Sequence, residues 1–214
     1  MRHRIFKVFL AVVVLPGTSA SAQTFTNREW VQTVGTPDAL NLASSALFPD
    51  GSVVIVGNTA SSQGDKDILV TKYAADGGQI WQQTFGGTAG SNDYGLAVRV
   101  DNNDAVIVAG SVINTGTNED IAVAKYDAAG SPEWTQTWDG GTSLMDYPSA
   151  LTLDAAGNVY VAGTSTGAST SSDYALLRID GSTGMLDWTS GYNYNNLPDY
   201  ATSLVLDGNG AIRR

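Results

Sequence analysis

Aspartates are the residues of this chain whose types and spacing could do chemistry. They recur at intervals of 53 residues in two sets. The first set is Asp67, Asp120 and Asp173, and the second is Asp101, Asp154 and Asp207. Paired carboxylates can act as general acid and base in glycoside hydrolysis, and carboxylate oxygens are ligands for calcium. Recurrence at a fixed interval favours a scaffold role instead, since repeated positions mostly hold a structure together.

Each set has a structural interpretation. We expect the first set to accept backbone hydrogen bonds where a strand begins, which would fix the same loop in every copy. We expect the second set to form Asx-turns where a strand ends. The stretch 101–104 reads Asp-Asn-Asn-Asp and offers several oxygens to calcium, but it lacks the complete spacing of a calcium-binding loop. A calcium ion there would stiffen the loop rather than catalyse a reaction.

Other catalytic side chains are scarce. The chain contains no cysteine and a single histidine, His3. The residues after His3 therefore contain neither histidine nor cysteine. This excludes, within those residues, catalysis by Ser-His-Asp or Cys-His groups, a histidine general base, and zinc sites built on histidine or thiolate. We predict a protein that is not an enzyme, with no catalytic residue and no cofactor-binding or metal-binding residue assigned.

The elements that carry these residues repeat as well. Trp81, Trp134 and Trp188 lie 53 and 54 residues apart, and a glycine series follows the same interval of 53. That series is Gly57, Gly110 and Gly163. Such a period is typical of tandem structural units. The copies span 40–92, 93–145 and 146–198, and 199–214 begins a fourth copy that stops early.

Apolar residues alternate within each copy and are separated by Gly-containing turn signals, as in half-buried strands. In the second copy this pattern predicts strands at about 94–101, 105–111, 120–126 and 133–138. Four antiparallel strands in a unit of about 50 residues are typical of a β-propeller blade. We therefore predict an all-β fold of three full blades and a partial blade, which form an incomplete ring.

The aromatic residues have two interpretations. The recurrent tryptophans could stack on sugars, but their fixed position favours packing between neighbouring blades. Trp138 occurs in one copy only, where Phe85 and Tyr192 stand in the others. The most favourable place for a ligand surface is a set of tyrosines at the first-strand entrances, for which packing is still the preferred role. This set is Tyr94, Tyr147 and Tyr200.

The copies resemble the bacterial β-propeller repeat known as SBBP. The matching positions are Asp154, Gly157 to Gly163, Asp173, Lys125-Tyr126-Asp127, Gly130 and Trp134. The resemblance extends over residues 40–214. It implies the blade fold and says little about activity, because such repeats occur in diverse secreted proteins.

The N-terminus resembles an export signal. Arg2, Arg4 and Lys7 precede an apolar stretch at 8–15, and the small residues at 20–22 fit a cleavage site. We predict a cleavable signal peptide at 1–22 and a secreted or periplasmic product that does not insert into a membrane. Residues 29–35 align with 80–86, so 23–39 would supply an outer strand to a shared closing blade.

The last copy stops within its second predicted strand, which begins after a first strand at 201–207. Because propellers usually have about four to eight blades, ring closure would require missing blades or another chain. We favour a fragment of a longer product over assembly with a second copy.

The negative net charge of the chain limits the kinds of molecule that it can bind. The full chain carries a formal net charge of −10, and loss of 1–22 leaves 8 basic against 21 acidic residues. Nucleic acid is therefore an improbable partner, since its binding requires clustered Lys and Arg. The sequence predicts an exported, non-catalytic binding, adhesion or surface scaffold with an unidentified protein or glycan ligand. The alternative is the propeller portion of an extracytoplasmic enzyme, quinone-dependent or glycan-active, whose catalytic residues lie beyond Arg214.

Overall fold

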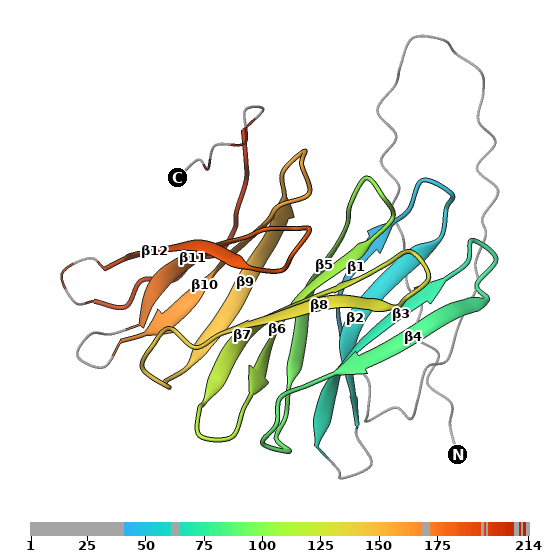
Figure 1. Cartoon of the computed structure of the whole chain (residues 1–214). Coiled ribbons are helices and arrows are strands. Elements are labelled where there is room, and N and C mark those ends of the chain that lie inside the picture. Colours follow the sequence, from blue (N-terminus) through green and yellow to red (C-terminus); the bar gives the residue numbers. More distant parts are fainter. Residues whose placement is uncertain are drawn as a thin grey trace.

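The computed structural model describes residues 41–60, 65–167, 172–193, 195, 197–207, 210 and 212. The expected signal peptide at 1–22 and the expected outer strand at 23–39 lie outside these residues. The described residues form three four-stranded antiparallel sheets that follow one another along the chain (Figure 1). They include no helix long and apolar enough to cross a membrane. The predicted all-β architecture of four-stranded blades is confirmed.

Each sheet is a simple meander in which strands adjacent in sequence are hydrogen-bonded neighbours. The first sheet contains β1 Asn41–Leu47, β2 Val53–Ala60, β3 Lys66–Tyr73 and β4 Gln79–Phe85. The second contains β5 Tyr94–Val100, β6 Val106–Ile113, β7 Glu119–Tyr126 and β8 Pro132–Trp138. The third contains β9 Asp146–Leu153, β10 Val159–Thr166, β11 Ser172–Ile179 and β12 Leu186–Tyr192. All four strands predicted in the second copy are present, with ends that differ by at most two residues.

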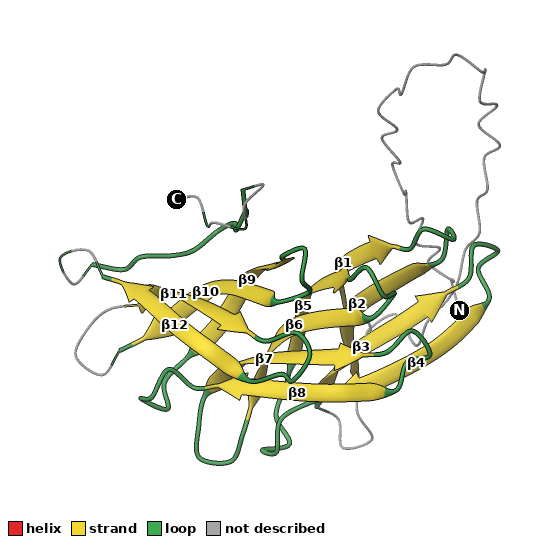
Figure 2. Ribbon diagram, turned by 45° about the horizontal axis from the view of Figure 1, so that its top comes forward, coloured by secondary structure: helices red, strands yellow, loops and turns green. Residues whose placement is uncertain are grey.

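The three sheets lie next to one another in chain order (Figure 2). The apolar core lies between successive sheets. Val56, Val70 and Val108 belong to the core between the first and second sheets, where all three are fully buried. Ile121 and Leu177 belong to the corresponding core between the second and third sheets. Alternation along each strand therefore supplies apolar side chains to both faces of the middle sheet, which is buried between its neighbours.

The recurrent glycines allow the sheets to approach closely. A Cβ atom on Gly110, in β6, would lie 2.6 Å from Cδ1 of Ile68 in the first sheet. A Cβ atom on Gly163, in β10, would lie 2.9 Å from Cδ1 of Ile121 in the second sheet. Each isoleucine thus packs against the bare backbone of the next sheet, which explains why the glycine recurs at the same interval.

The predicted strand at 201–207 does not form a strand. The described residues of this region contain one isolated antiparallel bridge, between Leu206 and Ile212. A strand in a sheet is stabilised by pairing with neighbours along its length, and here pairing is limited to that bridge.

Candidate functional site

Trp81 in the first sheet and Trp134 in the second each contact the sheet that follows. Nε1 of Trp81 donates a hydrogen bond to the carbonyl oxygen of Ala128 at 3.2 Å, and Nε1 of Trp134 donates to that of Gly181 at 3.2 Å. Trp81 is buried and Trp134 is half-buried. Trp188 belongs to the last described sheet, where its indole is 39% exposed and meets Tyr160 of the same sheet edge to face. Burial of the recurrent indole therefore depends on a following sheet.

The turn that receives each indole contains a glycine with positive φ. Gly130 has φ +87°, and a Cβ atom there would lie 2.7 Å from the ring of Trp81. Gly184 has φ +74° and the same relationship to Trp134. Glycine is thus required twice at this position, for the left-handed backbone and for contact with the ring.

Asp101 and Asp154 form Asx-turns. Oδ1 of Asp101 accepts hydrogen bonds from the amides of Asn103 at 2.8 Å and Ala105 at 2.9 Å. Oδ1 of Asp154 likewise accepts from the amides of Ala156 and Asn158. At Asp207 the backbone carbonyl accepts a hydrogen bond from the amide of Gly210.

The loop at 101–104 was the calcium candidate of the sequence. Oδ1 of Asp101 is engaged by backbone amides, and its Oδ2 lies 3.5 Å from Nζ of Lys125. A cation there would have to displace the lysine. Among the described residues, no three His, Cys, Asp or Glu side chains converge as a metal-binding cluster.

The third-strand aspartates differ from their expected role. Oδ2 of Asp120 accepts hydrogen bonds from the Asn114 side chain at 3.1 Å and the Thr117 hydroxyl at 2.8 Å. Oδ2 of Asp173 accepts from the Asn193 side chain at 3.1 Å. Among the described residues, the donors to these two carboxylates are side chains from neighbouring loops, whereas backbone donors were expected. The second oxygen, Oδ1, is buried without a hydrogen-bond partner in both.

Asp67, in β3, is half-buried. Burial raises the pKa of its carboxyl group, and the negative charge of Asp65 adds to the effect.

A second group of aspartates lies at the entrances to the first strands, and their role was not foreseen from the sequence. Oδ2 of Asp93 accepts a hydrogen bond from the amide of Gly87 at 2.7 Å, and its Oδ1 accepts from that of Ile113 at 2.8 Å. Asp146, the equivalent residue 53 positions later, is fully buried, and neither of its carboxylate oxygens accepts a hydrogen bond of good geometry, although the Ser165 hydroxyl and the Thr166 amide approach closely enough to lower its pKa. The available signal was the dipeptide Asp-Tyr, which recurs at 93, 146 and 199.

These surroundings change the acidity of both groups. Burial raises the pKa of Asp146 from 3.8 to about 6; nearby Ser165 and Thr166 oppose this shift, and the charges of Asp120 and Asp139 add to it. Burial also raises the pKa of Asp93, and hydrogen bonds from the amides of Ile113 and Gly87 oppose that shift. The carboxylate at this repeat position thus has two backbone hydrogen-bond donors at the junction of the first and second sheets, and poorer hydrogen bonding at the junction of the second and third.

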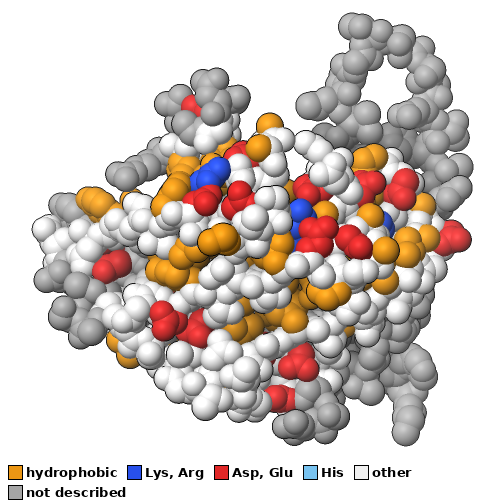
Figure 3. All heavy atoms as spheres, viewed as in Figure 1, with side chains coloured by type: hydrophobic (Ala, Val, Ile, Leu, Met, Phe, Trp, Pro, Cys, Tyr) orange, Lys and Arg blue, Asp and Glu red, His pale blue; other side chains and the backbone are white. Residues whose placement is uncertain are grey.

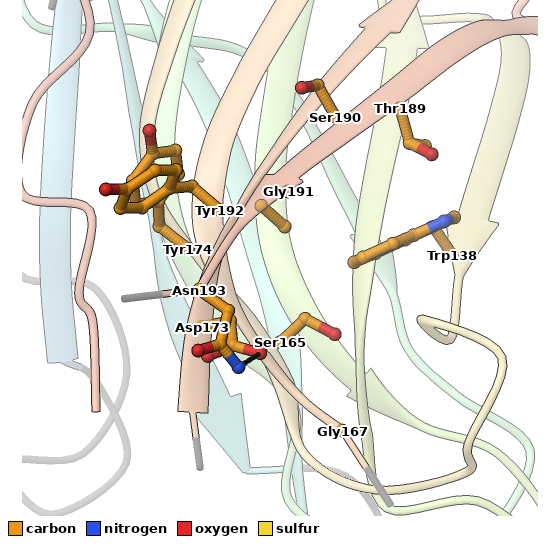
Figure 4. Close-up of a pocket in the computed structure, with 11 residues that line it drawn as sticks. Trp138, Ser165, Gly167, Asp173, Tyr174, Thr189, Ser190, Gly191, Tyr192 and Asn193 are labelled. Atoms are coloured by element: carbon orange, nitrogen blue, oxygen red, sulfur yellow. Dashed lines mark hydrogen bonds between the residues drawn. The ribbon is translucent and has the colours of Figure 1, made fainter. Parts of the chain in front are cut away.

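A pocket of about 290 Å³ lies beside the third sheet, between the end of β8 and strands β11 and β12 (Figure 4). Trp138 lies on one side, and the stacked rings of Tyr174 and Tyr192 lie on the other, with centroids 5.4 Å apart. Asp173 and Asn193 lie together at one end of the pocket, joined by their hydrogen bond. The pocket therefore combines aromatic walls with a polar end.

The pocket contains one sequence-predicted position from the aspartate sets, Asp173, and the non-repeated Trp138. The tyrosine set favoured as a ligand surface lies elsewhere. Its members, Tyr94, Tyr147 and Tyr200, are 41%, 36% and 58% exposed. Tyr94 lines a separate, polar hollow of about 510 Å³ with Asp65 and Glu119. Tyr174 was not singled out, because the neighbour that stacks on it comes from the adjacent strand.

Acidic side chains are spread over the face shown in Figure 3, with few Lys or Arg residues among them. Three ion pairs occur among the described residues. Two of them share Lys125, which contacts Asp101 and Glu133, and the third joins Arg178 to Asp187. Two of the five basic residues in the described ranges, Lys125 and Arg178, are thus paired with carboxylates.

Comparison with known proteins supports the fold. Residues 140–169 match the family model described as the beta-propeller repeat, SBBP. This span contains β9 and β10, so the resemblance seen in the sequence is confirmed there. No curated protein matches the chain.

Two solved structures resemble the chain at low identity. A GH43_1 enzyme from Xanthomonas citri, complexed with xylose, is 15% identical, with a TM-score of 0.43 over 82% of this chain. The tail fiber of Staphylococcus aureus phage P68 is 8% identical, with a TM-score of 0.27 over 80% of this chain. The chain spans 59% of the first structure's length and 44% of the second's.

Proposed function

We propose that this β-propeller repeat protein is an exported, non-catalytic scaffold that binds a carbohydrate in the pocket beside the third sheet. The observation that carries the proposal is the placement of Trp138. It is the only member of its repeat position with an indole, and it forms a wall of the pocket. A side chain that departs from the repeat at a cavity is better suited to a ligand than to the scaffold.

The shape and chemistry of the walls suit a sugar ring. The C–H face of a sugar packs against aromatic rings, and Trp138, Tyr174 and Tyr192 offer such surfaces. Gly191 lies between them and adds no side chain to the space (Figure 4). A ligand with a flat apolar face could therefore enter between the aromatic walls.

The polar end suits hydroxyl groups. Oδ1 of Asp173 is buried and has no hydrogen-bond partner, whereas its Oδ2 is held by Asn193. An unsatisfied buried acceptor costs about 1–3 kcal/mol. If the Asp173 side chain rotates so that Oδ1 faces the pocket, a sugar hydroxyl could donate to it and remove this cost.

The number of carboxylates in the pocket favours binding of a sugar over its hydrolysis. Asp173 is the one carboxylate among its lining residues, and glycoside hydrolysis generally uses a pair. The acidic balance of the chain is consistent with a neutral glycan as ligand, because an anionic one would be repelled.

Export is supported by the basic start, the apolar stretch and the small residues at 20–22. The full chain should be expressed with its own leader in a bacterial host, and the intact mass and N-terminal sequence of the product determined. We expect a product that begins at Gln23 and is recovered outside the cytoplasm. A cytoplasmic product that retains residues 1–22 would contradict export.

Ligand binding should be tested with the purified chain on an array of neutral oligosaccharides, followed by calorimetry with the best ligand. We expect the Trp138→Ala variant to bind at least about tenfold more weakly. The control is Trp188→Ala, which removes an exposed indole from β12 that does not line the pocket. We expect this control to retain wild-type affinity.

Tyr192→Ala provides a second variant, because Tyr192 is 43% exposed and its loss should leave the fold intact. Equal affinities for the wild type and both pocket variants would contradict a ligand in this pocket. Cleavage of the bound oligosaccharide would contradict the non-catalytic role and favour the enzyme alternative.

A further inference from the structure

The buried carboxylate oxygens that lack a hydrogen-bond partner of good geometry belong to aspartates at the beginnings of strands. Within the described residues they belong to four aspartates, and Asp146 contributes both of its oxygens. These residues are Asp65, Asp120, Asp146 and Asp173. Each lies at or just before the beginning of a first or third strand. The concentration of unsatisfied oxygens at equivalent places suggests a missing positive partner rather than a random defect.

The junction between the second and third sheets shows this most clearly. Asp146 is 0% exposed and Asp120 is 1% exposed, and three of their four carboxylate oxygens are unpartnered. The two groups are close enough for the charge of Asp120 to raise the pKa of Asp146. Two buried carboxylates of like charge are unfavourable unless a proton or a cation lies between them.

The preceding junction provides an internal comparison. There, Asp93 is only 2% exposed, but amides of Gly87 and Ile113 donate to its two oxygens. The equivalent amides near Asp146 are those of Gly140 and Thr166, and the Thr166 amide donates to the carbonyl of Met145. The Thr166 amide is thus shared between that carbonyl and Asp146, whose pKa it lowers, so Asp146 has weaker backbone donors than Asp93.

The space around Asp146 is kept open by a glycine. Gly140 has φ +59°, and a Cβ atom on it would lie 2.8 Å from each carboxylate oxygen of Asp146 and 2.6 Å from Oγ of Ser165. Three oxygen atoms therefore converge on one small region that lacks a side chain. All are hard donors of the kind that calcium prefers.

We propose that Asp146 and Asp120 bind a calcium ion at the junction between the second and third sheets. Asp146 would supply its two oxygens and Asp120 its Oδ1. Calcium takes about six to eight oxygen ligands, so the Ser165 hydroxyl, backbone carbonyls and water would complete the shell. Because Asp120 lies on β7 and Asp146 begins β9, the ion would join the two sheets.

The site differs from the loop at 101–104 in a way that can be tested. In that loop the Asp101 carboxylate already has two amide partners and a lysine, whereas among the described residues neither Asp120 nor Asp146 makes an ion pair, and the only backbone donor near Asp146 is the Thr166 amide. Substitutions at the two places should therefore affect calcium binding differently. Ser165 also lines the proposed glycan pocket, so glycan affinity should be measured both with and without calcium, which separates failure of one proposal from failure of the other.

The experiment uses the purified full chain, stripped with a chelator and titrated with calcium chloride by calorimetry and by thermal unfolding. We expect one site per chain, and a melting temperature about 5 °C or more higher in about 1 mM calcium. The variants Asp146→Asn and Asp120→Asn should lose both signals. Asp93→Asn and Asp104→Asn are the matched controls and should retain both.

Luminescence of terbium bound to the wild type, and its displacement by calcium, provides a measurement that does not depend on the variants folding. Displacement at the stoichiometry found by calorimetry would support the site. The proposal is overturned if the wild type binds no calcium, or if Asp146→Asn retains the response. A stability that rises on acidification with no response to calcium would mean that a proton occupies the pair, and would also overturn it.

Discussion

The indole nitrogen of Trp134, on β8, donates a hydrogen bond of 3.2 Å to the carbonyl oxygen of Gly181, in the turn that leads to β12. Trp81 makes the same bond to Ala128 one sheet earlier. Because 128 and 181 are 53 positions apart, the sequence period also describes how one sheet sits on the next. The same contact has thus been built twice from successive copies.

The buried indole should contribute strongly to stability. We expect Trp81→Ala to lower the free energy of unfolding by about 3–5 kcal/mol, since it leaves a cavity between two sheets. Trp188→Ala should cost about 1 kcal/mol or less, because that indole is 39% exposed. Urea unfolding monitored by far-ultraviolet circular dichroism measures both. Equal losses would contradict the role of the following sheet in burying the indole.

Two glycines allow backbone strain to be separated from packing. Gly130 and Gly116 have φ of +87° and +92°, but a Cβ atom would meet the Trp81 ring at the first and nothing within 4 Å at the second. We expect Gly116→Ala to cost about 1–2 kcal/mol from strain alone. Gly130→Ala should cost about 1–3 kcal/mol more, because the methyl group displaces the indole. Similar unfolding free energies for the two variants would refute this packing contact.

Asp146 should make stability depend on pH in calcium-free buffer. Its pKa is about 6 in the folded protein, against 3.8 for the ordinary group, so the folded state binds the proton more tightly. The stabilisation is complete below about pH 4 and is lost as the pH rises through 6, by at most about 3 kcal/mol. Asp146→Asn should flatten this part of the profile. Parallel profiles for the wild type and the variant would show that Asp146 is not the responsible group.

Asp93 should be a strong structural anchor. Asp93→Ala removes the acceptor for the amides of Gly87 and Ile113, and we expect a loss of about 2–4 kcal/mol. Asp93→Asn keeps one acceptor oxygen and should cost less. Hydrogen exchange at the two amides provides a local measurement, in which both should exchange faster in Asp93→Ala. Unchanged exchange would mean that other acceptors replace the carboxylate.

Much of the fold follows from local patterns in the sequence. The alternation of Val106 and Val108 and the turn signals between strands placed the four strands of the second sheet to within two residues. The interval between Gly110 and Gly163 identified them as equivalent. These predictions succeed because strand alternation and turn chemistry act over a few residues.

The candidate site depends on contacts that the repeat does not encode. Asp120 is held by the side chains of Asn114 and Thr117, and Asp173 by that of Asn193, which comes from a different loop. Asp146 is poorly satisfied because the Thr166 amide donates to the carbonyl of Met145. Such details depend on how sheets dock and how single loops bend, so periodicity alone could not predict them. Trp138 was recognisable as a departure from the repeat, but its place in a pocket was not.

The chain-order arrangement of the three sheets has a mechanical consequence. Each sheet is a continuous stretch of chain, and its main contacts are with the sheet before and the sheet after. Tension applied between the two ends should peel the sheets away one at a time. Each rupture would release about 53 residues, or roughly 180 Å of extended chain before subtraction of the folded length, so that a stretched molecule would yield in steps of equal size.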